Sequence, residues 1–281
     1  MWLISVCAAC GGGNDEAAIP VDGSSSGDAT PGGDAASGAV DAVLGTADAN
    51  PAGPCHGAAV CEDFESTAVG SVPGAPWTVS RPSCSGTGTL AVVSTQAHSG
   101  TRALEVRGGS TFCDHVFLAS AAPATLGSTL YARFFVRFAA AFTDAHTTFL
   151  ALADATDGKD LRMGGQKGIF MWNRELGDAT LPALGPAGIA LSVAPAANTW
   201  YCVEATIDAA GRSLHTSIDG VARSGLVIDA TPTPEIDEPW LRSAWSPRLQ
   251  DIRFGWEAYG NSPMTLWFDD VAVGPSPIGC N

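Results

Sequence analysis

The sequence predicts an all-β domain built as an antiparallel sandwich of two sheets. Apolar and polar side chains alternate with a period of two along several short segments, which is the spacing of a strand with one buried face. Small turn clusters separate these segments, and no segment carries a sustained apolar pattern at helical spacing. Many short strands joined by regular turns are typical of a β-sandwich or barrel.

The clearest strand is expected at residues 131–138, with the sequence YARFFVRF. The alternation places four side chains on one face of this strand: Tyr131, Arg133, Phe135 and Arg137. The other strands are expected, in chain order, at residues 89–94, 102–107, 147–153, 168–173, 200–208, 213–218, 252–258 and 265–273. The segment 207–221 is expected to form a hairpin through the Ala-Gly turn at 210–211.

Composition divides the chain near Pro54. Residues 1–54 contain no Lys or Arg and are rich in Gly, Ala, Ser and Asp, so they cannot bury enough apolar surface to offset the entropy of ordering. We therefore expect three parts. Residues 1–10 would be the remnant of a signal with its lipobox, residues 11–54 a disordered tether, and residues 55–281 a single β domain.

The start of the chain resembles a bacterial lipoprotein signal. Small residues precede Cys10 in the run CAACGGG at 7–13, and Cys10 is expected to carry the lipid; a plain secretory signal is the alternative. The predicted location is extracytoplasmic, as an outer-membrane or cell-surface lipoprotein and otherwise as a secreted protein. We expect a monomer that contacts membrane only through this anchor.

Charge narrows the range of partners. The formal net charge is −15, with 14 basic and 29 acidic residues, which leaves no basic stripe to displace counterions from nucleic-acid phosphates. Anionic lipid is excluded as a peripheral partner for the same reason. No apolar run approaches the ~20 residues that span a bilayer.

Eight cysteines predict a disulfide framework. If the two in the N-terminal signal are set aside, six remain, and an even number in an exported domain indicates paired cysteines. Cys84 and Cys113 flank a segment of hairpin size and are the first pair that we expect. The pairing of the other four stays open.

The order of several short motifs is more specific than any one of them. They are CEDFE at 61–65, HSGTRAL at 98–104, MWN at 171–173, WYCVE at 200–204 and WFDDVAV at 267–273. This succession resembles the concanavalin A-like jelly rolls, and within them the polysaccharide-lyase-like family of Cip-type cellulose-induced secreted proteins and glucuronan lyases. The resemblance covers nearly all of residues 55–281. It implies two packed antiparallel sheets, one of them concave and able to hold a glycan chain.

The resemblance also implies a structural calcium ion that ties the first strand to the last. It favours Glu65 and Asp270 as side-chain ligands, with Asp269 close to them and Ser99 at the tight turn. Such a set supplies the hard oxygens that calcium prefers. The alternative is that adjacent acids on these strands alternate between the edge of the core and water.

A lyase acting on a polyuronate needs a cation to neutralise the substrate carboxylate, a base and an acid. The expected catalytic set is Arg133 as the neutralising cation, His146 as the base, Tyr259 as the acid and Asn173 as a hydrogen-bonding group. Carbohydrate binding is expected from Arg137, Arg162 and Gln166, and from the rings of Trp172 and Trp256. Trp200 is a further stacking candidate, although Trp200 and Trp267 are as readily explained as core.

The expected function is a cell-surface or secreted carbohydrate-binding, polysaccharide-lyase-like protein whose partner is a plant or microbial polysaccharide. Catalysis stays open, because a non-catalytic binding module would use the same cleft. A structural or adhesive lipoprotein is the other alternative. Residues 55–281, the expected β domain, contain no Gly-x-Ser-x-Gly motif, which argues against a serine-esterase elbow. A glycosidase would need two opposed carboxylates, for which Glu175 and Glu204 could serve.

Overall fold

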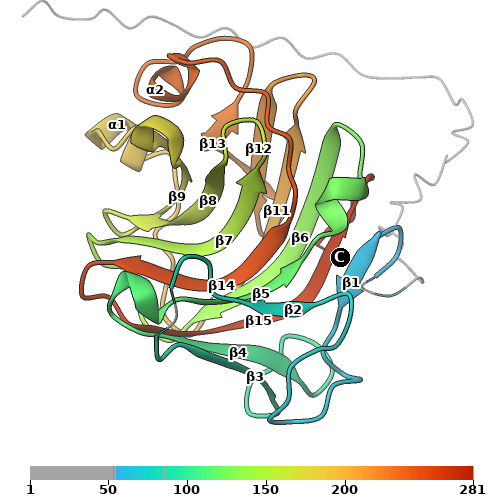
Figure 1. Ribbon diagram of the computed structural model, residues 1–281. Coiled ribbons are helices and arrows are strands. Elements are labelled where there is room, and N and C mark those ends of the chain that lie inside the picture. The colour runs from blue at the N-terminus through green and yellow to red at the C-terminus, as the bar shows by residue number, and fades with distance from the viewer. Residues whose placement is uncertain (1–52, 54, 85, 281) are drawn as a thin grey trace, which may run out of the picture. The chain divides into compact units, whose positions relative to one another are not determined.

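Two antiparallel sheets pack face to face in the computed structural model, which describes residues 53, 55–84 and 86–280 (Figure 1). Sheet A has the order β13 (Val221–Ile228), β12 (Ser213–Ile218), β11 (Trp200–Asp208), β6 (Thr129–Phe138), β15 (Met264–Gly274), β4 (Ala103–Gly108) and β3 (Thr89–Val93), with β1 (Val60–Glu62) paired to β15. Sheet B has the order β10 (Ala179–Leu181), β9 (Ile169–Arg174), β8 (Lys159–Gln166), β7 (His146–Asp154), β14 (Ile252–Tyr259), β5 (Val116–Ser120) and β2 (Thr78–Ser80).

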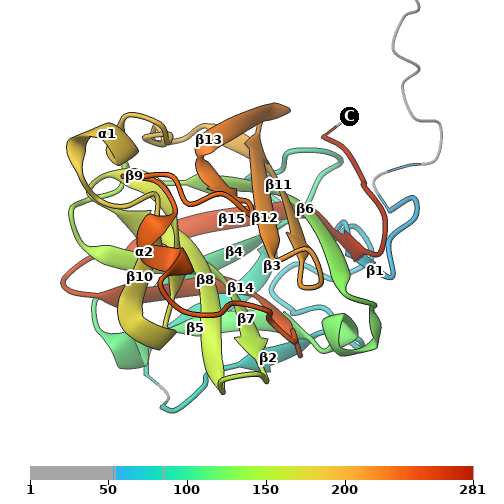
Figure 2. The same ribbon diagram turned by 90° about the horizontal axis from the view of Figure 1, so that it is seen from above.

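Helical structure among the described residues is limited to single turns. These are the 3₁₀ turns η1 (Phe112–Asp114), η2 (Ala122–Thr125) and η3 (Leu176–Asp178) and the α-helical turns α1 (Pro186–Ile189) and α2 (Glu238–Leu241). Helices α1 and α2 lie near β9, and α2 contacts β10 (Figure 1 and Figure 2). None of the described helices is long and apolar enough to cross a membrane. The predicted fold class, a two-sheet antiparallel β-sandwich of the jelly-roll kind, is confirmed.

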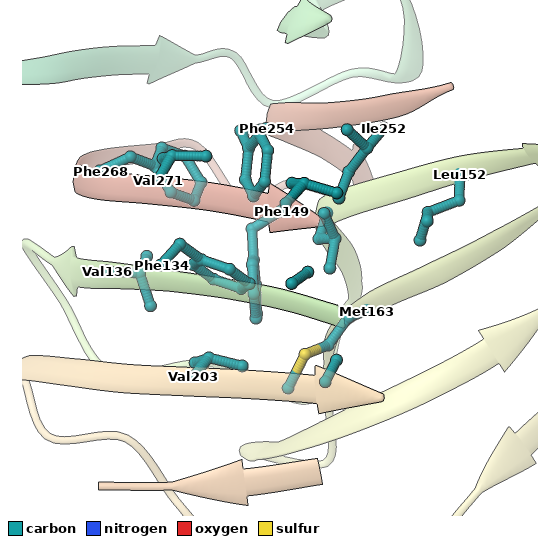
Figure 3. Close-up of a cluster of buried hydrophobic side chains, with 14 of the residues drawn as sticks. Phe134, Val136, Phe149, Leu152, Met163, Val203, Ile252, Phe254, Phe268 and Val271 are labelled. Atoms are coloured by element: carbon teal, nitrogen blue, oxygen red, sulfur yellow. The ribbon is translucent and has the colours of Figure 1, made fainter. Parts of the chain in front are cut away.

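The core lies between the sheets, and strand alternation explains its composition. In β6 the side chains of Phe134, Val136 and Phe138 point into the core and are wholly buried, while Arg133 and Arg137 belong to the other face. Phe134 meets Phe254 of sheet B with ring centroids 5.2 Å apart (Figure 3). Edge-to-face aromatic pairs of this kind add to the burial of apolar area, so they join the two sheets strongly.

Trp172 and Trp256 also belong to this core. Both side chains are 0% exposed. The indole N–H of Trp172 donates to Thr216 Oγ1 over 2.9 Å, and that of Trp256 donates to the Ser262 carbonyl over 3.2 Å. Neither ring can stack on a sugar, so the prediction for these two residues is wrong. Both rings lie on the faces of β9 and β14 that turn toward the core.

Three disulfides staple the domain: Cys55–Cys61, Cys84–Cys113 and Cys202–Cys280. The pair Cys84–Cys113 is the one that the sequence suggested, and it joins the loop before β3 to η1. Disulfides persist outside the reducing cytosol, so the three bridges fit an extracellular protein. The signal at residues 1–10, lipidation at Cys10 and the tether at 11–54, save Gly53, lie outside the described residues and stay predictions.

Candidate functional site

The outer face of sheet B carries a hollow of about 710 Å³. Strands β8 and β14 form its floor, and η1 and the loop after β2 form part of its wall. We call this hollow the cleft and define it by six of its residues: Phe112, Arg162, Glu175, Arg253, Glu257 and Tyr259. Another hollow, of about 440 Å³, lies between residues 123–130 and 247–250 and contains none of the predicted site residues.

Strand alternation brings the cleft side chains to one face. In β14 the apolar side chains of Phe254 and Trp256 enter the core, so Arg253, Glu257 and Tyr259 point outward. The sheet register then sets Tyr259 opposite His146 of β7, and it sets Arg162 of β8 opposite Asn173 of β9. Four neighbouring strands therefore deliver polar side chains to the same surface.

Tyr259 and Glu257 form a close pair in the cleft. The hydroxyl of Tyr259 donates to Glu257 Oε1 over 2.5 Å, and the guanidinium of Arg162 lies 5.5 Å from the centre of the tyrosine ring. Burial, reinforced by Glu257, raises the pKa of Tyr259 above its usual value. Burial likewise raises the pKa of Glu257. Tyr259 therefore keeps its phenolic proton and can give it to an acceptor in the cleft.

His146 lies against Tyr259 on the neighbouring strand. The two rings stack with centroids 5.0 Å apart. Burial is the main cause that lowers the pKa of His146 below 6.5, and Arg162 adds to the effect while Asp178 opposes it. Its Nε2 is buried and has no hydrogen-bond partner among the described residues. The imidazole is therefore neutral at neutral pH and able to accept a proton.

Arg162 lies between two carboxylates of the cleft. Its side-chain nitrogens are 3.2 Å from Glu175 Oε2 and 3.9 Å from Glu257 Oε1. Although burial opposes it, the backbone N–H of Asp160 and the charge of Arg162 hold the pKa of Glu175 below its usual value. The cleft thus contains an ionised acid, a cation and a carboxyl with a raised pKa side by side.

Other buried polar groups surround this cluster. Asn173 is wholly buried; its amide donates to Asp178 Oδ1 over 2.8 Å, while its Oδ1 has no partner among the described residues. His115 is also wholly buried, with Nδ1 3.4 Å from Glu257 Oε2. The sequence analysis missed His115, Arg253 and Glu257. Arg253 and Glu257 could have been found from the sequence, because they are charged residues four positions apart within an otherwise apolar strand.

Arg133 and Arg137 do not reach the cleft, because β6 belongs to sheet A and both side chains lie on the outer face of that sheet. Arg133 donates to the Asp270 carbonyl, and Arg137 lies over the ring of Trp267 and donates to Asn198. The expectation that these arginines share a cleft with His146 is wrong. Gln166 ends β8 and, like His146 and Asn173, is not part of the cleft lining; His146 adjoins the lining through its stacking on Tyr259.

The four residues predicted to bind calcium gather at one junction. Ser99 Oγ donates to Asp270 Oδ1 over 2.9 Å, and the backbone N–H of Ser99 donates to Asp269 Oδ2 over 3.2 Å. Burial, with the charge of Asp270, raises the pKa of Asp269 to about 7. Two buried neighbouring acids of this kind call for a compensating positive charge or a proton.

Glu65, the fourth residue predicted to bind calcium, already accepts hydrogen bonds from the backbone. The Glu65 carboxylate accepts the backbone N–H groups of Thr101 and Arg102, each over 2.7 Å, and Arg102 also donates to the Glu65 and Thr67 carbonyls. Within the described part of the chain, no three His, Cys, Asp or Glu side chains converge as a metal cluster. Asp269 is engaged in the same way as Glu65, since its carboxylate accepts the backbone N–H groups of His98, Ser99 and Asp270. A calcium ion at this junction stays a prediction.

Comparison with known proteins adds two findings. Residues 63–276 match the family described as polysaccharide lyase-like, Cip1-like, core domain. The solved structure of a cellulose-induced protein, Cip1, is 33% identical, with a TM-score of 0.72 over 79% of this chain and 100% of that one. An endo-β-1,4-glucuronan lyase from the fungus Trichoderma reesei is 15% identical over 78% of this chain and 96% of that one; its TM-score of 0.49 is too low to bear on function. No curated protein matches the chain.

Proposed function

The chain belongs to the Cip1-like, polysaccharide-lyase-like family, and on that premise we propose that it binds an acidic polysaccharide in the cleft and cleaves it by β-elimination. The observation that carries the proposal is the meeting of a cation, a neutral imidazole and a protonated phenol on one face of sheet B. These are the three groups that elimination from a polyuronate requires.

In the proposed reaction Arg162 takes the role that the sequence analysis gave to Arg133. Its guanidinium exchanges Glu175 for the substrate carboxylate and so acidifies the proton on the adjacent carbon. The imidazole of His146 accepts that proton, and a double bond forms as the bond from the ring to the glycosidic oxygen breaks. Tyr259 gives its proton to the leaving oxygen. The proton on His146 then returns to the Tyr259 oxygen directly or through water, which restores both groups and balances atoms and charges.

The pH dependence of cleavage tests this assignment. We expect unsaturated uronate, detected by its ultraviolet absorbance, to appear with a polyuronate such as glucuronan or alginate and not with cellulose. The rate should be steady near neutral pH and should fall as pH decreases through the pKa of His146, which burial places below 6.5, because the imidazolium cannot accept a proton. No unsaturated product from any polyuronate would contradict catalysis.

A second candidate is a binding module that does not cleave. It is favoured by the pairing of every cation in the cleft with protein acids: Arg162 with Glu175, Arg253 with Asp160 and Asp251, and Lys159 with Glu175. Affinity electrophoresis through glucuronan, alginate, xylan and cellulose separates the alternatives. If a polysaccharide slows the protein in the gel without being cleaved, the result would support a binding module. Unchanged mobility in every gel would contradict polysaccharide binding and favour a structural or adhesive role at the cell surface.

We also propose calcium at the junction of Ser99, Asp269 and Asp270, with Glu65 beside them. The ion would neutralise two buried acids and fasten the 98–102 turn to β15. At a calcium concentration about 100 times its Kd, the bound ion would add ~2.7 kcal/mol to the unfolding free energy, which corresponds to roughly 5–10 °C in Tm for a domain of this size. Thermal unfolding with EDTA and then with added calcium measures this; equal Tm values would rule the ion out.

A further inference from the structure

A single cross-strand row on the outer face of sheet B holds two arginines. The register pairs Asn173 of β9 with Arg162 of β8, Arg162 with Ala151 of β7, and Ala151 with Arg253 of β14. Arg162 and Arg253 therefore lie on the same face, two strands apart, with Ala151 between them in the row. Since neighbouring strands are 4.7–4.9 Å apart, the two arginines stand ~9.5 Å apart along the row.

Arg253 is held rigidly within the cleft. Its side chain is 5% exposed, and its guanidinium contacts Asp160 Oδ1 at 2.5 Å and Asp251 Oδ1 at 3.1 Å. Asp160 also approaches Arg162, at 4.0 Å, so one acid stands between the two cations. The carboxylates of Asp160 and Asp251 are 21% and 29% exposed, so water can solvate them if an incoming carboxylate takes their place.

We propose that Arg253 is a second carboxylate subsite of the cleft and that the ligand is a run of consecutive uronate units lying across β8, β7 and β14. In an extended β-1,4-linked chain, successive sugars face alternately, so carboxylates two units apart point the same way. Two sugar units of such a chain are comparable in length to the two strand spacings, ~9.5 Å, that separate the arginines. Each arginine offers a planar fork that fits a carboxylate through two hydrogen bonds.

This inference rests on the proposed function and narrows its substrate class. A polymer in which isolated uronate groups are scattered along a neutral backbone would reach one arginine at a time. A homopolymer of uronate would reach both, because units i and i+2 both carry the acid. Ala151 adds little bulk to this row, and its methyl group is buried beneath the neighbouring side chains.

Ligand length distinguishes the two subsites. A β-1,4-linked glucuronate trimer has carboxylates two units apart, whereas the dimer does not. Calorimetric binding would be measured in a His146→Ala background, which keeps both oligosaccharides intact. We expect Arg253→Gln to weaken trimer binding about tenfold, the effect of one lost bidentate pair, and dimer binding by no more than about twofold. Arg107→Gln, which removes an exposed arginine of sheet A, should change neither affinity.

Equal effects of Arg253→Gln on the trimer and dimer would overturn the second subsite. If Arg253→Gln does not fold, the same binding measurements on Arg253→Lys test the second subsite. Lysine keeps the charge between Asp160 and Asp251 and loses the fork, so the preference for the trimer should still fall. Loss of trimer binding in Arg162→Gln with full binding in Arg253→Gln would retain the cleft and refute this inference alone. Failure of the background protein to bind either oligosaccharide would refute the proposed function as well.

Discussion

Replacing Arg162 with glutamine is expected to lower kcat/KM for polyuronate cleavage by about 10²–10³-fold, as the loss of one preorganised charge-stabilising donor does in other enzymes. The guanidinium of Arg162 lies 5.5 Å from the centre of the Tyr259 ring, which stacks on His146. Without it the charge that develops on the substrate carboxylate has no partner at the reacting unit. Initial rates of ultraviolet absorbance change, measured over a range of substrate concentrations, give the effect.

Two controls separate this chemical role from a structural one. Arg162→Lys restores the charge without the planar fork and should recover part of the lost rate, because a point charge still neutralises a carboxylate. Arg107→Gln removes a cation from the opposite sheet, where the side chain is 67% exposed, and should leave the rate unchanged. Wild-type kcat/KM in the folded Arg162→Gln protein would remove Arg162 from the reaction.

Replacing Phe134 with alanine is expected to lower the free energy of unfolding by about 3–5 kcal/mol. The ring is 0% exposed and contacts Phe149, Phe254 and Phe268, with centroids 6.2, 5.2 and 6.0 Å away (Figure 3). These partners come from both sheets, so a single truncation opens a cavity at the centre of the sandwich. Urea unfolding would show a lower midpoint with an unchanged slope if the native state keeps its compactness.

Leu176→Ala is the matched control, since Leu176 is 40% exposed at η3 and surface truncations usually cost less than ~0.5 kcal/mol. A loss below ~1 kcal/mol in Phe134→Ala would mean that the core collapses around the missing ring. Because Phe149 and Phe254 lie on β7 and β14, whose outer faces carry the cleft, the same variant should also reduce ligand binding in the folded state.

The strands could be predicted wherever alternation was visible. Each of the nine expected segments corresponds to a strand of the structure, and β11 and β12 form the hairpin expected near Ala210-Gly211. Strand β8 was missed because Gly164 and Gly165 interrupt its pattern. At Gly164 an added Cβ would stand 1.7 Å from the Thr147 carbonyl oxygen, so glycine is needed there for the close approach of β7. Strand β5, a short apolar run, has no alternation to detect.

The candidate site was harder to predict than the strands. Alternation tells which side chains share a face, as it did for Arg133 and Arg137, but it does not tell which sheet a strand joins. The sheet that a strand joins depends on pairing with strands far away in the sequence. This pairing places Arg133 and Arg137 on sheet A, whereas His146 and Tyr259 lie on sheet B. In β9 both faces are buried, so the sequence contained no sign that Trp172 turns inward.

Both ends of the described domain are fastened to the same sheet. Strand β1 pairs with β15 (Figure 1), and the Cys202–Cys280 bridge ties the residues after β15 to β11. A pulling force applied where the chain enters the domain would pass into sheet A through the β1–β15 ladder. Since β1 has no ladder with sheet B, we expect the sheet that carries the cleft to bear less of that load than sheet A.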